Sequence, residues 1–363
     1  MTTMTKTETV RGTKQSMAGT MKAVVIRGFG GSDVLELTEV PLAEPRPRHL
    51  LIKVNAAGLN RFDHYIRQGE IAPELPWPHI LGSDAAGEVA AIGAGVTGFE
   101  IGDGVIPVPG YPLDEDEWGI RPAGTAASFT LPGLGRPGTY AQYIEFPAEF
   151  TVKDRTGLSP ELVATLPMVL ATGVRSVKTV GGVKSGDTVL VHAGAGGAGS
   201  MQVQIAKALG AKVATTVRSQ EDADFARSLG ADFVIDTSTD DFVGRVKEWT
   251  DGQGVDVVID SLGGDVLPKS IEAARPLGTI VVFGFAAGTE TTFDVTSLFF
   301  TQKRLLGSMA SDKEDLEYGL ELVAAGHIRP ILDRALPLSE AAEAHRLIAD
   351  NEITGSVVLL PWV

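Results

Sequence analysis

The sequence predicts an α/β protein of two domains, a β-rich domain and a second domain built on a doubly wound parallel sheet. The chain has 363 residues, which at roughly 150 residues per domain suggests about two domains. Residues 21–150 hold short runs rich in Val, Ile and Ala between Pro and Gly clusters, a pattern typical of β-structure. From residue 159 onward, apolar runs alternate with segments of helical spacing. This alternation indicates a parallel sheet that is covered by helices on both faces.

The β-rich part contains four apolar runs that predict strands, at residues 21–26, 49–58, 85–93 and 138–146. Between the last two runs, residues 105–137 are rich in proline and glycine and carry the acidic run Asp114–Glu117. We expect residues 105–137 to form a long irregular excursion that passes over the active site. The acidic run is interpreted as a solvated turn.

The second part predicts strands and helices in regular alternation. Residues 187–193 (DTVLVHA) are continuously apolar at their centre, as expected of a strand that is buried on both faces. Further strands are expected at 212–217, 232–236, 255–262 and 278–285, and helices at 197–209, 221–229, 240–249 and 266–275. The last segment predicts helices at 313–325 and 339–350 and strands at 331–336 and 356–360.

The first 20 residues are polar, rich in Thr and Lys, and lack the apolar centre of a signal peptide. We expect residues 1–20 to be a disordered leader and the folded part to begin at Met21. The sequence has no run of the roughly 18 apolar residues that a membrane-spanning helix needs. We therefore expect no membrane contact and a cytoplasmic location.

The composition excludes several classes of function. Lys and Arg number 31 against 46 Asp and Glu, for a formal charge of −15. Nonspecific binding of nucleic acid needs clustered basic residues, so nucleic acid is not an expected partner. The chain has no cysteine, which excludes disulfides, cysteine-ligated zinc, iron–sulfur clusters and a cysteine nucleophile.

A glycine-rich loop lies between the predicted strand 187–193 and the predicted helix 197–209. Gly194, Gly196 and Gly199 fit the pattern G-x-G-x-x-G, in which the glycines permit a tight turn, close approach of a pyrophosphate and close helix–strand packing. The start of the helix then offers free N–H groups to the phosphates. We expect this loop to bind a dinucleotide through Gly194, Gly196, Gly197, Ala198 and Gly199. The alternative is a glycine-rich turn that binds no ligand.

The end of the next strand indicates which dinucleotide is bound. Enzymes that use NAD usually place Asp or Glu there, to accept a hydrogen bond from the ribose 2′-OH. This chain has Arg218 and Ser219 instead, and an arginine can pair with a 2′-phosphate. The sequence therefore predicts NADP(H) as the cofactor. The alternative is that Arg218 is only a solvated surface residue.

Several motifs resemble those of the medium-chain dehydrogenase/reductase superfamily, and most closely those of its zinc-free, quinone oxidoreductase-like branch. The resemblance covers nearly the whole chain and implies a GroES-like β-rich catalytic domain, residues 21–155 and 312–363. It also implies a Rossmann doubly wound parallel-sheet cofactor domain, residues 156–311, and a homodimer. The motifs that carry it are Asn60–Gly69 (NRFDHYIRQG), Leu81–Val89 (LGSDAAGEV), Ala193–Gly199 (AGAGGAG), Asp260–Gly264 (DSLGG) and Thr354–Leu359 (TGSVVL).

The resemblance also shows which residues occupy the positions of the catalytic zinc ligands in zinc-dependent relatives. Those positions hold Asn60, Ser83 and approximately Met168, and none of these is a good zinc ligand. The six histidines do not form a replacement pair at helical spacing. His64 is interpreted mainly as a surface or packing residue, and His192 as a core histidine. We therefore expect no metal, and hydride transfer without a Lewis acid.

Quinones and α,β-unsaturated carbonyls suit such chemistry, because conjugation spreads the charge that develops on oxygen. We expect Asn60 and Tyr65 to donate hydrogen bonds to that oxygen, through an amide N–H and a phenol O–H. Asp63 is expected to orient these groups rather than to move a proton. The alternative for all three is a turn needed only for the structure. By resemblance, the further cofactor contacts are Thr172 at a helix start, Ser261 and Leu262 after one strand, and Phe283 and Phe285 at the end of the next.

Three functions remain open from the sequence. The first is an NADPH-dependent, zinc-independent reductase of quinones, enones or similar activated carbonyl compounds of apolar character. The second is a zinc-free alcohol dehydrogenase, an aldehyde or ketone reductase, or an enoyl-thioester reductase. The third is a noncatalytic NADPH-binding protein. The substrate itself does not follow from the sequence, because loops form the wall of the cleft.

Overall fold

The computed structural model describes residues 19–42, 44–71 and 74–363. The expected leader therefore lies outside the described residues, except for Gly19 and Thr20. These two residues belong to the first strand and pair with Leu42 and Pro41. The expectation that the fold begins at Met21 was wrong by two residues, because pairing along the edge continues past the apolar run.

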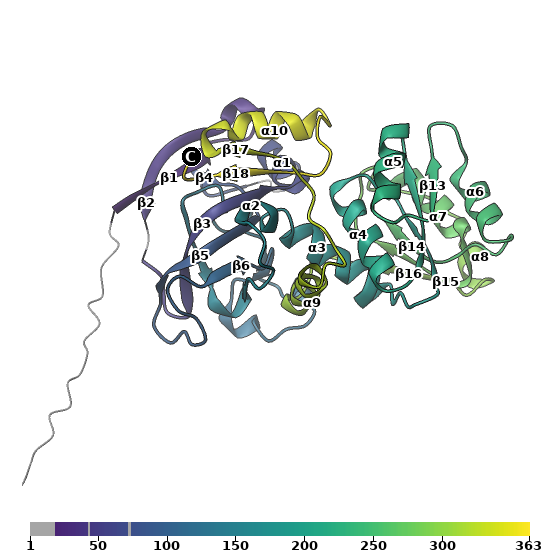
Figure 1. The fold of residues 1–363 in the computed structure, drawn as a ribbon, viewed down its shortest axis with the longest axis horizontal. Coiled ribbons are helices and arrows are strands. Elements are labelled where there is room, and N and C mark those ends of the chain that lie inside the picture. Colours follow the sequence, from purple (N-terminus) through teal and green to yellow (C-terminus); the bar gives the residue numbers. More distant parts are fainter. Residues whose placement is uncertain (1–18, 43, 72–73) are drawn as a thin grey trace, which may run out of the picture.

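The β-rich part contains mainly antiparallel sheets, in which β17 and β18 form a parallel pair (Figure 1). A three-stranded sheet has the order β2-β1-β4, and a larger sheet has the order β10-β6-β5-β3-β18-β17, with β9 also paired to β3. A short pair, β7-β8, lies in the excursion. The strands are β1 (Gly19–Ile26), β2 (Glu36–Leu42), β3 (His49–Leu59), β4 (His79–Ile80), β5 (Asp84–Ile92), β6 (Gly104–Pro107), β7 (Tyr111–Pro112), β8 (Phe129–Thr130), β9 (Tyr143–Pro147), β10 (Thr151–Lys153), β17 (Leu332–Pro337) and β18 (Ser356–Leu360).

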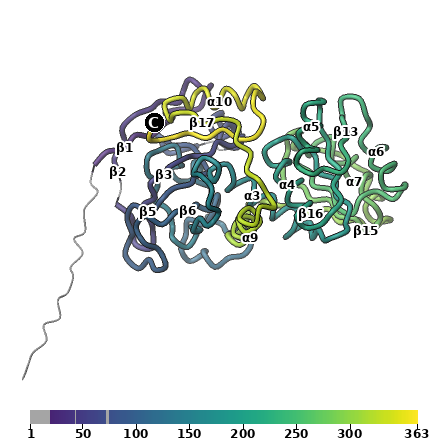
Figure 2. The backbone as a smooth tube through the Cα atoms, viewed as in Figure 1, coloured from purple at the N-terminus to yellow at the C-terminus, as the bar shows by residue number. Residues whose placement is uncertain are grey.

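The end of the chain returns to this first part. Strand β18 pairs antiparallel with β3, through Val357 with Leu59 and Leu359 with Ala57. Figure 2 shows the yellow C-terminal trace running beside the purple N-terminal strands. The expected strands at 331–336 and 356–360 are thus present, and they complete the sheet from the far end of the sequence.

The second part is a six-stranded parallel sheet of order β13-β12-β11-β14-β15-β16. This order places the first strand of the unit, β11, in the middle beside β14. The strand order therefore changes direction between β11 and β14, as in doubly wound dinucleotide-binding folds. The predicted fold class is therefore confirmed. The strands are β11 (Thr188–Val191), β12 (Lys212–Val217), β13 (Phe233–Asp236), β14 (Val255–Asp260), β15 (Ala274–Val282) and β16 (Arg304–Gly307).

Helices cover both faces of the parallel sheet, and each face has its own apolar core. The core on one face, which includes Val189 and Ile205, is continuous with that of the β-rich part, whereas Leu190 and Val258 belong to the core on the other face. The helices are α1 (Arg61–Gln68), α2 (Pro160–Val163), α3 (Pro167–Val174), α4 (Gly197–Ala208), α5 (Gln220–Ser228), α6 (Phe242–Trp249), α7 (Leu267–Ala273), α8 (Thr296–Phe299), α9 (Lys313–Ala324) and α10 (Ala341–Ala349). None of the helices in the described ranges is long and apolar enough to cross a membrane.

Several strand predictions need correction. The runs 187–193 and 255–262 form strands only as far as Val191 and Asp260. The run 278–285 was expected to be a strand to its end, but β15 ends at Val282, because Gly284 turns the chain close against Ser261. The run 138–146 forms a strand only from Tyr143, because the backbone before it bonds to Ile80, Leu81 and Val24 in another sheet.

The junction between the two parts is built by α3 and α9. Helix α3 packs against both α4 of the parallel sheet and α9, and Figure 1 shows both helices between the two sheets. A π-helical turn, Arg175–Val180, extends α3. This junction brings residues of both parts together at one site.

Candidate functional site

The glycine loop has the close contacts that the motif predicts. A Cβ on Gly194 would lie 2.0 Å from the Thr215 hydroxyl, and a Cβ on Gly199 would lie 2.1 Å from the carbonyl oxygen of Ala193. Helix α4 begins at Gly197, and no side chain caps its N-terminus. Its first N–H groups are therefore free to bind an anion such as a pyrophosphate. This backbone fits a dinucleotide.

A buried hydrogen-bond network around His192 lies next to the glycine loop and holds its first residues. Ser270 donates to Asp260 at 2.7 Å, so its hydroxyl accepts from His192 Nε2 at 2.9 Å. The Thr216 hydroxyl contacts His192 Nδ1 at 3.1 Å and accepts from the Ala193 N–H. Burial lowers the pKa of His192, which favours the neutral ring with its proton on Nε2. The interpretation of His192 as a core histidine is confirmed.

The end of β12 is free of carboxylate partners. Arg218 is exposed and, within the part of the chain that the structure describes, has no ion pair or hydrogen bond. Ser219 caps α5 by accepting from the Asp222 N–H at 3.1 Å. The structure therefore leaves the Arg218 guanidinium available and gives the Ser219 hydroxyl a structural task as well.

Asn60 lies at the centre of a buried polar network on the other side of the cleft. Its Nδ2 donates to Ser83 Oγ at 3.1 Å and to Asp84 Oδ2 at 2.9 Å. Asp84 also accepts from the Met168 N–H at the start of α3. Both amide hydrogens of Asn60 are thus used within the protein. The expectation that this amide N–H donates to a substrate does not fit this arrangement.

Asp63 holds the start of α1. Its Oδ2 accepts from the Asn60 N–H at 2.8 Å and from the Tyr140 hydroxyl at 3.3 Å. Asp63 is fully buried, and burial raises its pKa to about 7. Burial raises the pKa of Asp84 to about 7 as well. These contacts agree with the expectation that Asp63 orients its neighbours.

Tyr65 differs from Asn60 in its hydrogen bonding. Its hydroxyl has no hydrogen-bond partner among the residues that the structure describes, and its ring lies 6.0 Å from that of Phe285 at an interplanar angle of 32°. Tyr65 comes from α1 of the β-rich part, and Phe285 follows β15 of the parallel sheet. The ring contact therefore crosses the cleft, and it leaves the phenol group free to donate.

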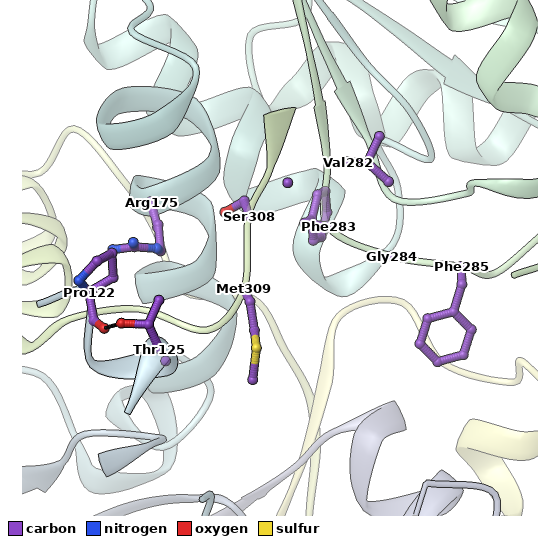
Figure 3. A pocket seen from close by; sticks show the side chains of 11 residues that line it. Pro122, Thr125, Arg175, Val282, Phe283, Gly284, Phe285, Ser308 and Met309 are labelled. Carbon is purple, nitrogen blue, oxygen red and sulfur yellow. Dashed lines mark hydrogen bonds between the residues drawn. The ribbon is translucent and has the colours of Figure 1, made fainter. Parts of the chain in front are cut away.

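A cavity of about 410 Å³ opens beside Phe285 (Figure 3). Phe283 and Phe285 were predicted at this site. Val282 and Gly284, next to them in the chain, also line the cavity. Sequence reasoning missed the other residues of the wall, because they come from three segments that are far apart in the chain. The missed residues are Pro122, Gly124 and Thr125 of the excursion, Arg175 after α3, and Gly307, Ser308 and Met309 after β16.

The remaining predicted cofactor residues lie around the same edge of the sheet. Ser261 and Leu262 follow β14, where the Leu262 N–H donates to Asp260 Oδ1 at 2.8 Å. Thr172 was expected at the start of a helix, but it lies inside α3. Gly197 also lies near α3, since a Cβ there would be 3.8 Å from Val169. Helix α3 therefore borders both the glycine loop and Asp84.

The residues at the zinc positions do not fit a metal. Asn60 directs its amide hydrogens at Ser83 and Asp84, and Met168 contacts Asp84 through its backbone N–H. Within the described ranges, no three His, Cys, Asp or Glu side chains are grouped so that they could hold an ion.

Comparisons with known proteins agree with this architecture. Residues 46–156 match the alcohol dehydrogenase GroES-like domain, and residues 197–325 match the family described as zinc-binding dehydrogenase. A 2-haloacrylate reductase of Burkholderia sp is 34% identical, over 93% of this chain and 98% of its own. A quinone oxidoreductase of Pseudomonas aeruginosa is also 34% identical, over 94% of this chain and 99% of its own.

Solved structures show the same similarity. The crystal structure of an NAD-dependent alcohol dehydrogenase matches with a TM-score of 0.86 and 34% identity, over 94% of this chain and 99% of that one. The structure of mycobacterial Rv1454c complexed with NADPH matches with a TM-score of 0.78 and 32% identity, over 94% and 100%. Sequence and structure together place this chain in the medium-chain dehydrogenase/reductase family, as an oxidoreductase enzyme of the quinone oxidoreductase-like branch.

Proposed function

We propose that the enzyme is a zinc-independent, NADPH-dependent reductase of quinones, enones or similar activated carbonyl compounds. The proposal rests on the hydrogen bonding of two polar side chains at the cleft, Asn60 and Tyr65. The Asn60 side chain, at a zinc position, donates to Ser83 and Asp84. The Tyr65 ring lies beside that of Phe285, and its hydroxyl has no hydrogen-bond partner among the described residues. The negative charge that develops on a substrate oxygen would then be stabilised by a hydrogen bond from the Tyr65 hydroxyl and not by a zinc ion.

Each polar residue at the cleft has a separate role in this proposal. Bound NADPH would supply the hydride. Tyr65 donates a hydrogen bond to the substrate oxygen as negative charge develops there. Asp63 holds the N-terminus of α1 and so positions Tyr65, which lies on the same helix. Asn60 shapes the cleft and keeps Asp84 hydrogen-bonded. The proton that completes the reduction comes from the phenol or from solvent.

The test is a substrate panel with NADPH: quinones, enones, aldehydes and enoyl thioesters, followed by loss of NADPH absorbance. We expect turnover of the quinones and enones. Tyr65→Phe should lower kcat about a hundredfold, since loss of one such donor costs two to three orders of magnitude in other enzymes, while the Kd for NADPH stays unchanged. Turnover of aldehydes alone would contradict the proposal. Cofactor binding without any turnover would favour the noncatalytic alternative.

The choice of NADPH has its own support in Arg218. A guanidinium without a carboxylate partner at the end of β12 can bind a 2′-phosphate, and the similar mycobacterial structure contains NADPH. A charge-assisted hydrogen bond contributes about 1.5–3 kcal/mol. Arg218→Ala should therefore raise the KM for NADPH roughly ten- to hundredfold and leave that for NADH within a factor of about two.

Arg227→Ala is the matched control for the cofactor measurement, because Arg227 is exposed on α5 and already paired with Asp224. It should leave both KM values as they are. A wild-type enzyme that prefers NADH would contradict the assignment of Arg218.

The proposal extends to a homodimer. Strand β16 is the last strand of the parallel sheet, and in the described ranges no strand pairs with its outer edge. A second copy could pair with this edge. The apolar side chains of Leu277 and Val295 are exposed on the same domain. Light scattering should give twice the chain mass of 38.1 kDa, and the mass of a single chain would contradict the dimer.

A further inference from the structure

A continuous chain of buried hydrogen bonds joins the glycine loop to the loop that follows β14, residues 261–264. None of its side chains has a role in the hydride transfer proposed above, and all of them are buried. The chain runs from the Asp260 carboxylate through the Ser270 hydroxyl, the His192 ring and the Thr216 hydroxyl to the Ala193 N–H. The His192 ring also packs edge-on against Phe242, so its orientation is fixed.

Every hydrogen bond of this chain points in the same direction. Ser270 donates its one hydroxyl hydrogen to Asp260 Oδ2, so the proton between His192 and Ser270 belongs to His192 Nε2. In the neutral ring, Nδ1 then accepts from the Thr216 hydroxyl. The Thr216 oxygen is left to accept the Ala193 N–H at 3.0 Å. Successive hydrogen bonds of this kind polarise and strengthen one another in a buried site, so Asp260 acts on Ala193 through three side chains.

One end of the chain holds the residue that shapes the glycine loop. Ala193 has a φ of 55°, in the left-handed region that is unfavourable for residues with a side chain. Its N–H is held by Thr216, and its carbonyl oxygen accepts from the Gly196 N–H at 2.9 Å. A Cβ on Gly199 would lie 2.1 Å from the same oxygen. The orientation of Ala193 therefore sets the start of α4, whose free N–H groups are expected to bind the pyrophosphate.

The other end of the chain holds the loop after β14. Asp260 Oδ1 accepts from the Leu262 N–H at 2.8 Å and from the Gly263 N–H at 2.9 Å. Gly263 and Gly264 have φ values of 63° and 47°. Glycine permits such a turn but does not fix it, so the bonds to Asp260 give the loop its shape. One carboxylate thus holds both loops at this edge of the sheet.

We propose that Asp260, Ser270 and His192 are positioning residues for the cofactor, which hold the glycine loop in the conformation that binds the dinucleotide. Their side chains are 0% exposed, so they act without touching the dinucleotide. The inference rests on the nicotinamide cofactor of the proposed function and deepens its account of how that cofactor is bound. It does not depend on the substrate.

Ser270 shows how a residue away from the loop can change cofactor affinity. Without its hydroxyl, no group fixes the proton on His192 Nε2, and the Thr216 hydroxyl loses its fixed acceptor. The glycine loop is then in its binding conformation for a smaller fraction of the time, and the apparent Kd rises in proportion. The usual net contribution of one hydrogen bond corresponds to about a two- to twelvefold change in an equilibrium constant.

The experiment measures the Kd for NADPH and for NADH by nucleotide fluorescence, without substrate, in wild type and three variants. Ser270→Ala should raise the Kd of the dinucleotide that the wild type binds about three- to sixfold. Thr216→Val removes the acceptor of the Ala193 N–H itself and should raise this Kd about tenfold. Thr216→Ser keeps the hydroxyl and should restore the Kd to within about twofold of the wild-type value.

Thr188→Val is the matched control. The Thr188 hydroxyl also bonds to an aspartate of β14, Asp256, but at the opposite edge of the same sheet. Its loss should lower the melting temperature and leave both Kd values unchanged. The double variant Ser270→Ala/Thr216→Val tests whether the two hydroxyls act through one chain. Because Thr216→Val already releases Ala193, adding Ser270→Ala should raise the Kd by less than about 1.5-fold.

The outcomes separate this role from the proposed function. A Ser270→Ala variant with the wild-type Kd, or single effects that multiply in the double variant, would overturn the positioning chain while the proposed function stands. An equal effect of Thr188→Val would show that lost stability alone weakens binding, and would overturn the chain as well. If Thr216→Val does not fold, Ser270→Ala against Thr188→Val decides the role. A wild type that binds neither dinucleotide would refute the proposed function together with this role.

Discussion

Asp63 and Asp84 are two buried carboxyl groups on either side of Asn60, and no cation of the described chain pairs with them. Both oxygens of Asp84 accept hydrogen bonds, from Asn60 and the Met168 N–H, whereas Asp63 Oδ1 has no partner among the residues that the structure describes. Ionising both groups places two like charges in a low-dielectric interior. The pair therefore binds protons more tightly in the folded protein than in the unfolded chain.

This difference sets the sign of a pH effect on stability. The pKa of Asp84 rises from 3.8 to about 7 on folding, so between these values the folded state binds more protons. The free energy of unfolding should then fall as pH rises from about 4 to 7, by up to about 1.4 kcal/mol per pH unit for each such group. Asp84→Asn removes one of these groups, so the fall in the free energy of unfolding between pH 5 and 7.5 should be smaller.

Urea unfolding at pH 5 and pH 7.5 measures this difference. Asp224→Asn, on the exposed face of α5, serves as the control and should show the wild-type difference. An Asp84→Asn variant with the wild-type pH dependence would show that Asp84 is ionised throughout this range.

For individual residues, the sequence predicted some hydrogen-bond partners and not others. Asn60 and Asp63 are three residues apart, and the contact between them is a helix-start pattern that can be read locally. Tyr140 bonds to the same carboxylate from 77 residues away. That contact depends on the packing of two sheets, and no local pattern encodes it.

Among the elements, those of the parallel sheet were the easiest to predict. Strands buried on both faces are continuous apolar runs, so β11, β12 and β14 stood out from the helices between them. The end of β15 was misjudged because apolar residues continue past the last ladder bond at Val282. What ends the strand is the close contact of Gly284 with Ser261, a tertiary contact that hydrophobicity does not report.

Helix α3 shows why the site could be predicted only in part. Met168 bonds to Asp84, Val169 faces Gly197, and Arg175 follows at the cavity. The sequence singled out Thr172 in this helix by resemblance, but it did not indicate Arg175. A buried arginine is recognised by its partners, Asp312 and Asp315, which lie far along the chain.

For the whole molecule, Asp312 links the three segments that meet at the junction. Its Oδ2 accepts from Arg175 at 2.9 Å, and its Oδ1 accepts from the Ala123 N–H of the excursion at 2.6 Å. It also begins helix α9 in a capping box with Asp315. The excursion, expected to pass over the active site, thus contributes Pro122 and Thr125 to the cavity wall and is anchored there through Asp312.

Asp312→Ala should lower stability by about 1–3 kcal/mol, because the helix loses its cap and Arg175 loses one of two carboxylates. It should also raise the substrate KM several-fold, because the cavity wall at Ala123 loses its anchor. Asp312→Ser separates the effect on stability from the effect on KM. Serine can cap a helix, but it is too short to accept hydrogen bonds from both Arg175 and Ala123. We expect Asp312→Ser to regain part of the lost melting temperature and to keep the raised KM. Recovery of both by serine would show that the cap alone matters, and that the excursion holds its place through its other contacts.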